Sequence, residues 1–232
     1  MAKLRMEITK GDEVRFIAHL DYARAIERAI RRANLPAAYS EGFNPHMKLA
    51  FASALGVGVA SDVEYVDIEL THEVNVSDVL TKLGSQFPSG ITVKRAKYMP
   101  AASPALMAIV NLAIYSINIP IAPEANRAAI EASVTSFNNA DEVLFIRHSP
   151  KGKREIHVKE FVRQVAMRIE DNRLTLDFEC IITAQGTIKP SEVIGALAES
   201  FGLPIDKDNI SINRVGLFVA DNGVRLSPLD LS

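Results

Sequence analysis

The fold is decided early in the chain, where the hydrophobic period changes within KLRMEITKGDEVRFIAHLDYARAIERAIRRAN (residues 3–34). From Leu4 to Ile8, apolar residues alternate with charged ones, which is the period of a half-buried strand. From Ala18 to Asn34, apolar residues recur at helical spacing and share one side of a helix. Asn34 tolerates the left-handed conformation that ends helices, and Pro36 cannot continue one. The stretch therefore predicts a strand and then an amphipathic helix, both facing a core.

The rest of the chain gives the same order of elements twice. In the first half, the periods predict further strands at 48–55, 63–70 and 91–98 and a second helix at 76–83. In the second half, they predict strands at 112–119, 143–146 and 211–219, a hairpin at 168–183 and helices at 123–137 and 190–201. We therefore expect an α+β protein of tandem ferredoxin-like (βαββαβ) units with antiparallel sheets. The predicted boundaries are an N-terminal domain at 1–98, a linker at 99–111 and a C-terminal domain at 112–232.

Composition limits the class of protein without naming a function. The 232 residues are 48% hydrophobic and 23% charged, which is the ordinary balance of a folded protein. The 26 basic and 28 acidic side chains nearly cancel, so attraction to nucleic acid must come from a local patch. A single cysteine cannot form an internal disulfide or hold an iron–sulfur cluster by itself. With no apolar run of about 18 residues, we expect a cytoplasmic protein that neither spans a membrane nor carries a cofactor.

The densest signal is YSEGFNPH (residues 39–46), which leads directly into an apolar strand. Gly42 and Asn44-Pro45 favour a turn, and Phe43 is expected to anchor the loop in the core. A neutral imidazole and a nearby cation can bind phosphate or transfer a proton, so this loop is a predicted binding site. Its predicted members are Tyr39, Asn44, Pro45, His46 and Lys48, with His19 at the start of the first helix joining them. The alternative is an ordinary turn that happens to end in a histidine.

Two groups of basic residues are further candidates for binding phosphate. Arg24, Arg28, Arg31 and Arg32 share the polar side of the first helix, although Asp21 and Glu27 can satisfy several of them. The segment RHSPKGKR (residues 147–154) has no acidic residue and is predicted to be a mobile basic loop. Its cations are Arg147, Lys151, Lys153 and Arg154. The alternatives are a solvated helix face for the first group and a solvated linker for the second.

Other patterns are weaker and receive no function. LGVGVAS (residues 55–61) lacks the Gly-Lys-Ser/Thr ending of a phosphate-binding loop. Glu64 is expected to face the opposite side of its strand from Asp67 and Glu69, and no histidine follows at the spacing of metal ligands. Cys180 stands between apolar residues and is expected to be a small buried side chain. We therefore predict no catalytic residue and no metal site.

Several motifs in this sequence resemble the radical-SAM-linked family of bacterial proteins, a domain of unknown function. The strongest are FIAHLD (16–21), RAIRRA (28–33), YSEGFNPH (39–46) and GVASDVEY (58–65), with a weaker TIKPSEV at 187–193. In that family the domain is fused to, or encoded beside, a radical S-adenosylmethionine enzyme. The resemblance therefore implies such an enzyme as partner. This chain has no CxxxCxxC, so any radical chemistry would belong to the partner.

Three classes of function remain open from the sequence. The first is a noncatalytic, RNA-binding or substrate-presenting accessory protein of a radical S-adenosylmethionine enzyme, favoured by the implied partner and the basic patches. The second is a metal-independent endoribonuclease of ferredoxin-like fold, in which Tyr39, His46 and Lys48 supply acid–base groups. The third is an adaptor that binds only protein. We expect the first, with a chain that is inert on its own.

Overall fold

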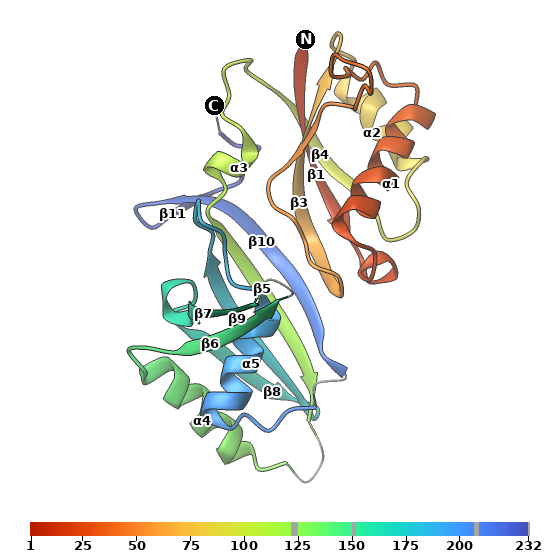
Figure 1. Cartoon of the computed structure of the whole chain (residues 1–232). Helices are drawn as coiled ribbons and strands as arrows, with labels where there is room; N and C mark the ends of the chain where they lie inside the picture. The colour runs from red at the N-terminus through yellow and green to blue at the C-terminus, as the bar shows by residue number, and fades with distance from the viewer. Residues whose placement is uncertain (122–124, 150–151, 207–208, 232) are drawn as a thin grey trace. The chain divides into compact units, whose positions relative to one another are not determined.

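The computed structural model describes residues 1–121, 125–149, 152–206 and 209–231 of the chain (Figure 1). Helices and strands are mixed, and each strand pairing given below is antiparallel, so the predicted α+β class is confirmed. The chain forms two units, of which the first is Met1–Asn111 with Leu217–Ser232 and the second is Leu112–Gly216. The predicted C-terminal domain extends from residue 112 to residue 232, whereas Leu217–Ser232 belongs to the first unit.

The strand predicted at the start of the chain is β1 (Ala2–Lys10), the central strand of the first unit. It pairs with β3 (Val59–Leu70) on one side and with β4 (Val93–Met99) on the other. The short β2 (Leu49–Phe51) pairs with β3, and β10 (Ser211–Asp221) follows β3 in the strand order. Only three residues of the strand expected at 48–55 therefore join the sheet.

Two helices cover one face of this sheet, α1 (His19–Arg32) and α2 (Val76–Gly84), as Figure 1 shows. Their buried side chains pack with the alternate residues of β1 and β3 that point to the same side, which form the core predicted from the two periods. After α1 the chain reverses at Asn34, whose φ of 52° is the left-handed conformation expected there. Three shorter elements complete the unit: a 3-10 turn at Asp12–Val14, α3 (Leu106–Ile109) and β11 (Val224–Leu226).

The second unit has the strand order β10-β5-β9-β8. β5 (Leu112–Pro120) pairs with β9 (Arg173–Ile181), which forms the predicted hairpin with β8 (Val165–Glu170). The turn of that hairpin has Asp171 and Asn172 at positive φ. The helices are α4 (Arg127–Asn139) and α5 (Pro190–Phe201), and a separate hairpin joins β6 (Leu144–Ser149) to β7 (Gly152–His157), followed by a 3-10 turn at Val158–Glu160.

The helices of the second unit begin and end as their sequences favour. The Asn126 side chain accepts hydrogen bonds from two backbone amides of the first turn of α4. Pro190 opens α5, and Gly202, at φ 67°, closes it. Phe137 of α4 and Phe201 of α5 meet edge to face with ring centroids 5.7 Å apart. Among the described residues, no helix is long and apolar enough to cross a membrane.

Candidate nucleic-acid interface

The predicted loop at residues 40–46 is held closed at its neck by backbone and side-chain hydrogen bonds. The Ser40 amide donates to the His46 carbonyl at 2.8 Å, and the His46 amide donates to Ser40 Oγ at 3.0 Å. Next to this neck, Tyr39 and Met47 form an isolated β-bridge. Gly42 has a φ of 119°, which a residue with a side chain rarely adopts. The loop therefore has a defined shape.

The side chains of this loop point outward, which corrects one expectation. Phe43 was expected to anchor the loop in the core, but it is fully exposed at 107% of its reference area. Met47, only 5% exposed, is the residue that fixes the end of the loop to the core. Asn44, Pro45 and His46 are exposed as well. The loop is thus a rigid projection that carries an aromatic ring and an imidazole into solvent.

Lys48 and His19, which were predicted to join His46 in a binding site, contact other residues instead. The Lys48 ammonium lies 3.0 Å from Glu69 Oε2, and both residues are partly buried. Lys48 also precedes β2 rather than lying within it. The His19 ring packs edge to face on Phe51, with centroids 4.9 Å apart. Of the predicted site, Tyr39 and residues 44–46 therefore stay solvent-facing, whereas Lys48 is neutralised and His19 is packed.

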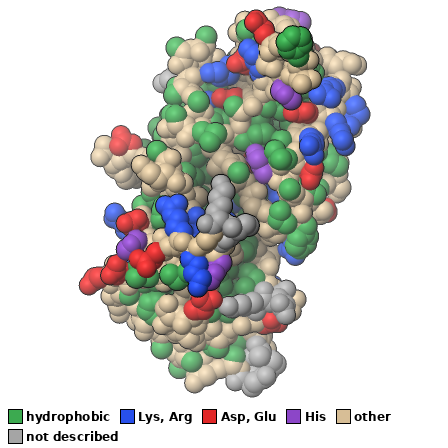
Figure 2. Space-filling view, viewed as in Figure 1, with side chains coloured by type: hydrophobic (Ala, Val, Ile, Leu, Met, Phe, Trp, Pro, Cys, Tyr) green, Lys and Arg blue, Asp and Glu red, His purple; other side chains and the backbone are tan. Residues whose placement is uncertain are grey.

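The arginines of α1 divide into paired and unpaired side chains. Arg24 forms an ion pair with Asp21 at 3.1 Å, and Arg31 lies 3.5 Å from Glu27. Arg32 donates to the side chain and the backbone carbonyl of Gln86. Arg28 is exposed, and no ion pair or hydrogen bond joins its side chain to another of the described residues. Figure 2 shows basic side chains gathered over this part of the first unit.

The described residues of the second predicted patch lie on two paired strands instead of forming a mobile loop. Arg147 and Arg154 face each other on the paired strands β6 and β7. Arg147 binds Glu192 of α5 with two hydrogen bonds of 2.6 Å, a geometry that only arginine offers a carboxylate. Lys153 and Arg154 are exposed, and Lys151 lies outside the described residues. The prediction failed for Arg147 because its partner is 45 positions away in the chain.

This ion pair shifts the pKa values of Arg147 and Glu192 in the directions that favour their charged forms. The hydrogen bond that Arg147 donates to Glu192 raises the pKa of Arg147, although partial burial works against it. Burial alone would raise the pKa of Glu192, but the hydrogen bonds from Arg147 and from the Lys189 amide outweigh it, and the pKa lies below its ordinary value. Both groups are therefore charged at neutral pH, and Arg147 serves the fold rather than a ligand.

A polar network that the sequence analysis missed lies on the face of the first sheet opposite α1 and α2. Arg5 is fully buried and binds Asp67 through two hydrogen bonds, Nε to Oδ1 at 2.7 Å and Nη2 to Oδ2 at 2.9 Å. Its third donor, Nη1, reaches the Pro228 carbonyl at 2.9 Å. Glu69, also on β3, is held by Lys48. Asp67 and Glu69, two of the residues weighed as a metal cluster, are therefore engaged by cations.

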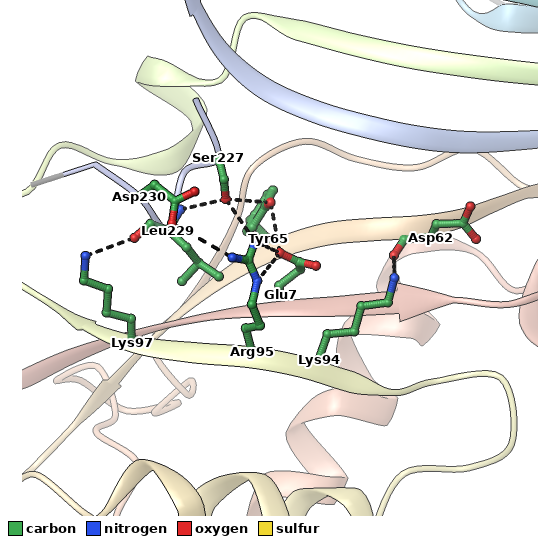
Figure 3. A network of polar contacts seen from close by, with 9 residues as sticks. All are labelled: Glu7, Asp62, Tyr65, Lys94, Arg95, Lys97, Ser227, Leu229 and Asp230. Atoms are coloured by element: carbon green, nitrogen blue, oxygen red, sulfur yellow. Dashed lines mark hydrogen bonds and ion pairs between the residues drawn. The ribbon is translucent and has the colours of Figure 1, made fainter. Parts of the chain in front are cut away.

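The network continues along β4, as Figure 3 shows. Arg95 Nε donates to Glu7 Oε2 at 3.0 Å, and the Tyr65 hydroxyl donates to the same oxygen at 3.1 Å. Ser227 Oγ lies 2.9 Å from the Tyr65 oxygen and 3.4 Å from Arg95 Nη2. Because the single Tyr65 proton goes to the carboxylate, Ser227 is the donor to Tyr65. Lys97 donates to the Leu229 carbonyl at 3.2 Å.

Burial and charge tune the ionisable groups of this network. Burial raises the pKa of Tyr65 to about 12, and the Glu7 carboxylate adds to the effect while Ser227 opposes it. The hydrogen bond to Glu7 raises the pKa of Arg95. The phenol and the guanidinium therefore both keep their protons at any physiological pH. The alternation of Lys3, Arg5 and Glu7 with apolar residues predicted a half-buried strand, but Arg5 and Glu7 on its polar side are buried as well.

Cys180 is the small buried side chain that the sequence predicted. It is 1% exposed, and its sulfur lies 3.2 Å from Thr187 Oγ1. Burial raises the pKa of this thiol, which disfavours the reactive thiolate.

Comparison with solved structures extends the description of the fold. The chain resembles one in "Crystal Structure of a Cbf5-Nop10-Gar1 Complex" with a TM-score of 0.51 and 12% identity, over 93% of this chain and 48% of that one. It also matches a chain of "Structure of H/ACA RNP bound to a substrate RNA containing 2'-deoxyuridine" with a TM-score of 0.46 and 11% identity, over 92% and 46% of the two chains. The chain thus spans about half the length of these proteins. At such low identity the first likeness concerns fold alone.

Comparison of sequences gives the family. No curated protein matches this chain in sequence. Nothing in the comparisons links it to radical S-adenosylmethionine enzymes, so that partner stays a prediction. Residues 3–190 match the model of DUF2344, described as an uncharacterized protein conserved in bacteria, and the chain belongs to this family.

Proposed function

We propose that this protein is a noncatalytic RNA-binding protein that presents RNA to a partner enzyme. The contact surface consists of the exposed side of α1 and the loop at residues 39–46. The observation that carries the proposal is the combination of an exposed, unpaired cation, Arg28, with a fully exposed aromatic ring, Phe43, on a rigid loop. Unstacked RNA bases stack on aromatic side chains, while cations follow the phosphates.

The chain path supports the idea that these two features act together. Only residues 33–36 lie between the end of α1 and Ala37, which bridges to the end of β3 and leads into the loop. Arg31 and Arg32 lie in that last turn, and their present partners, Glu27 and Gln86, are on the surface. Exposed pairs of this kind contribute little, so a phosphate can replace them at low cost.

The two other classes of function have less support from the geometry. An endoribonuclease would need acid–base groups converging on one bond, but Lys48 is neutralised by Glu69 and His19 packs on Phe51. An adaptor that binds only protein would not need the exposed, unpaired guanidinium of Arg28. The partner enzyme of the proposal is the radical S-adenosylmethionine enzyme implied by the sequence resemblance.

We also propose that each unit is a variant of the ferredoxin-like fold. In the first unit, β1, α1, β2, β3, α2 and β4 follow in that order, and the strands are arranged as β4-β1-β3 with β2 on β3. In the second, β5, α4, β8, β9, α5 and β10 give the order β10-β5-β9-β8, with the β6–β7 hairpin inserted after α4. Both arrangements support a βαββαβ unit.

Fluorescence anisotropy with labelled single-stranded RNA, measured over a range of salt concentrations, tests the proposed function. We expect Arg28→Ala to weaken binding and to lower the slope of log K against log salt by about 0.7, the value for one phosphate contact to a single strand. Phe43→Ala is expected to cost about 1–3 kcal/mol of binding without changing the slope. Arg127→Ala and Met107→Ala remove an exposed cation and an exposed apolar side chain elsewhere, and serve as matched controls.

Three results would contradict the proposal in different ways. Wild-type protein that binds no RNA at low salt, yet co-purifies with a partner enzyme, would indicate a protein adaptor. Cleavage of the RNA by the purified chain would indicate the endoribonuclease. Variants at Arg28 and Phe43 that bind like the two controls would place the RNA on another surface.

A further inference from the structure

The polar network on the first unit's sheet converges on one short segment, Ser227–Asp230, which we name the strap. Arg5 donates to the Pro228 carbonyl, Lys97 to the Leu229 carbonyl and Arg95 to Ser227 Oγ. Arg95 Nη1 also lies 3.9 Å from Asp230 Oδ1. Three cations on the sheet thus donate to, or pair with, oxygens of four consecutive residues. Figure 3 shows the side chains of Arg95 and Lys97 directed at this segment.

The sheet itself holds two of these cations, Arg5 and Arg95, in place. Asp67 fixes two of the nitrogens of Arg5, and Glu7 fixes Arg95 and Tyr65 through one carboxylate oxygen. All of these contacts join β1, β3 and β4 to one another and none involves the strap. The two guanidinium groups of this donor array would therefore keep their positions if the strap moved away, which is the preorganisation that a binding site requires.

The charges of the array show what kind of group suits it. Three cations, Arg5, Arg95 and Lys97, face two carboxylates, Glu7 and Asp67, so the sheet side keeps one positive charge in excess. Asp230 supplies the negative charge that balances it. The strap presents carbonyl, hydroxyl and carboxylate oxygens as acceptors, and a phosphate group likewise presents several oxygen acceptors with negative charge.

We propose that this face of the first unit is a phosphate-binding site, and that the strap occupies it as a built-in substitute for the ligand. The site lies on the opposite face of the sheet from α1 and α2 and does not depend on the RNA-binding surface proposed above. A phosphate displaces the strap by accepting hydrogen bonds from Arg5, Arg95 and Lys97. The Leu229 side chain, which is 3% exposed, leaves its buried position at the same time.

The test uses the full-length chain with a variant that weakens the strap, Ser227→Ala combined with Asp230→Ala. The probes are inorganic phosphate and a short, labelled single-stranded RNA. Apparent affinity is proportional to the fraction of molecules in which the strap has left the site. The variant lacks hydrogen bonds and an ion pair that hold the strap in place, so phosphate binding is expected to strengthen by about five- to thirtyfold. Glu131→Ala removes one exposed carboxylate from α4 and controls for the change in net charge.

Adding Arg95→Ala and Lys97→Ala to the strap variant is expected to abolish the gain. A gain that survives these changes, or that Glu131→Ala reproduces, overturns the proposal. A gain over wild type for inorganic phosphate alone identifies a site for a terminal phosphate, whereas a gain for RNA alone identifies a site for a phosphodiester. If neither probe binds the strap variant more tightly than it binds wild type, the proposal is wrong, and the result for Arg28 and Phe43 is unaffected.

A measurement on the wild-type chain covers the case in which the strap variant does not fold. The Leu229 amide donates to Ser227 Oγ at 3.2 Å, so its hydrogen exchange reports whether the strap is in place. Saturating phosphate or RNA is expected to accelerate exchange at this amide while the amides of β1 stay protected. Unchanged or slower exchange at Leu229 would show that no ligand replaces the strap.

Discussion

The buried pair between Arg5 and Asp67 offers a sharp test of the energetics of the first unit. The side chains are 1% and 8% exposed and are joined by two hydrogen bonds, so the change Asp67→Ala leaves a guanidinium almost without solvent or counter-charge. Removing one partner of a buried pair costs about 3–5 kcal/mol, because the remaining charge stays desolvated. That is a large part of the total stability of about 5–15 kcal/mol typical of a folded domain.

This loss of unfolding free energy can be converted into a change in melting temperature. For a protein of this size each kcal/mol corresponds to about 2–4 °C, so Asp67→Ala is expected to lower the melting temperature by about 6–20 °C. Replacing both members with apolar residues, Arg5→Met with Asp67→Leu, removes the stranded charge as well as the pair. The double variant is therefore expected to recover most of the loss.

Urea denaturation and calorimetry of wild type, Asp67→Ala, the single variants Arg5→Met and Asp67→Leu, and the double variant measure the effect. Glu170→Ala is the control, because Arg168 and Glu170 form a pair at 3.4 Å whose side chains are 60% and 69% exposed. That variant is expected to change stability by less than about 0.5 kcal/mol. The reasoning is refuted if Asp67→Ala costs no more than the control, or if the double variant is as unstable as the sum of the two single ones.

Three further predictions follow from contacts elsewhere in the chain. Gly195→Ala would place a methyl group 2.7 Å from the Phe145 ring, so a loss of about 1–3 kcal/mol is expected in thermal melting. Asn75→Ala removes the acceptor for the Ser77 amide at the start of α2 and is expected to cost about 1 kcal/mol in urea denaturation. The lowered pKa of Glu192 stabilises the fold fully above the group's ordinary value of 4.5, and this stability is lost as the pH falls through the lower value in the fold. The difference in stability between wild type and Glu192→Gln should therefore be constant near neutral pH and shrink in acid; a constant difference down to pH values well below 4.5 would contradict the assignment.

Local patterns in the sequence were sufficient for most of the elements. The change of period between Leu4 and Asn34, the turn at residues 170–172 and the proline and glycine that bound α5 each depend on interactions within a few residues. Such signals are contained in the stretch being interpreted, so the sequence predicts them well. The strand expected at 48–55 was too long, because an apolar run does not say how many of its residues find a partner strand.

The candidate site was predicted less well, because side-chain direction and long-range pairing decide it. Turn-forming neighbours place Phe43 in a loop but do not say whether its ring faces the core or the solvent. Arg147 stands among cations in the sequence, yet it pairs with Glu192 across 45 positions. Lys48 is neutralised by Glu69, 21 positions away. None of these partners lies within the window from which a period or a turn is inferred.

The two faces of the first sheet also differ in a way that bears on the strap. A cover with a purely structural role is best made apolar, because apolar burial stabilises a fold while every buried charge must first be desolvated and then paired. The helix face has a core of aliphatic side chains and Tyr22, and the buried ammonium of Lys10 donates to the Arg15 and Ile17 carbonyls just before α1. The strap face instead buries Arg5, Glu7 and Asp67 under four residues that contribute one large apolar side chain, Leu229, beside Pro228. Burying a charged face of this kind permanently costs desolvation free energy. A second occupant that binds these cations would account for that cost, and this is the role that the phosphate-binding proposal gives them.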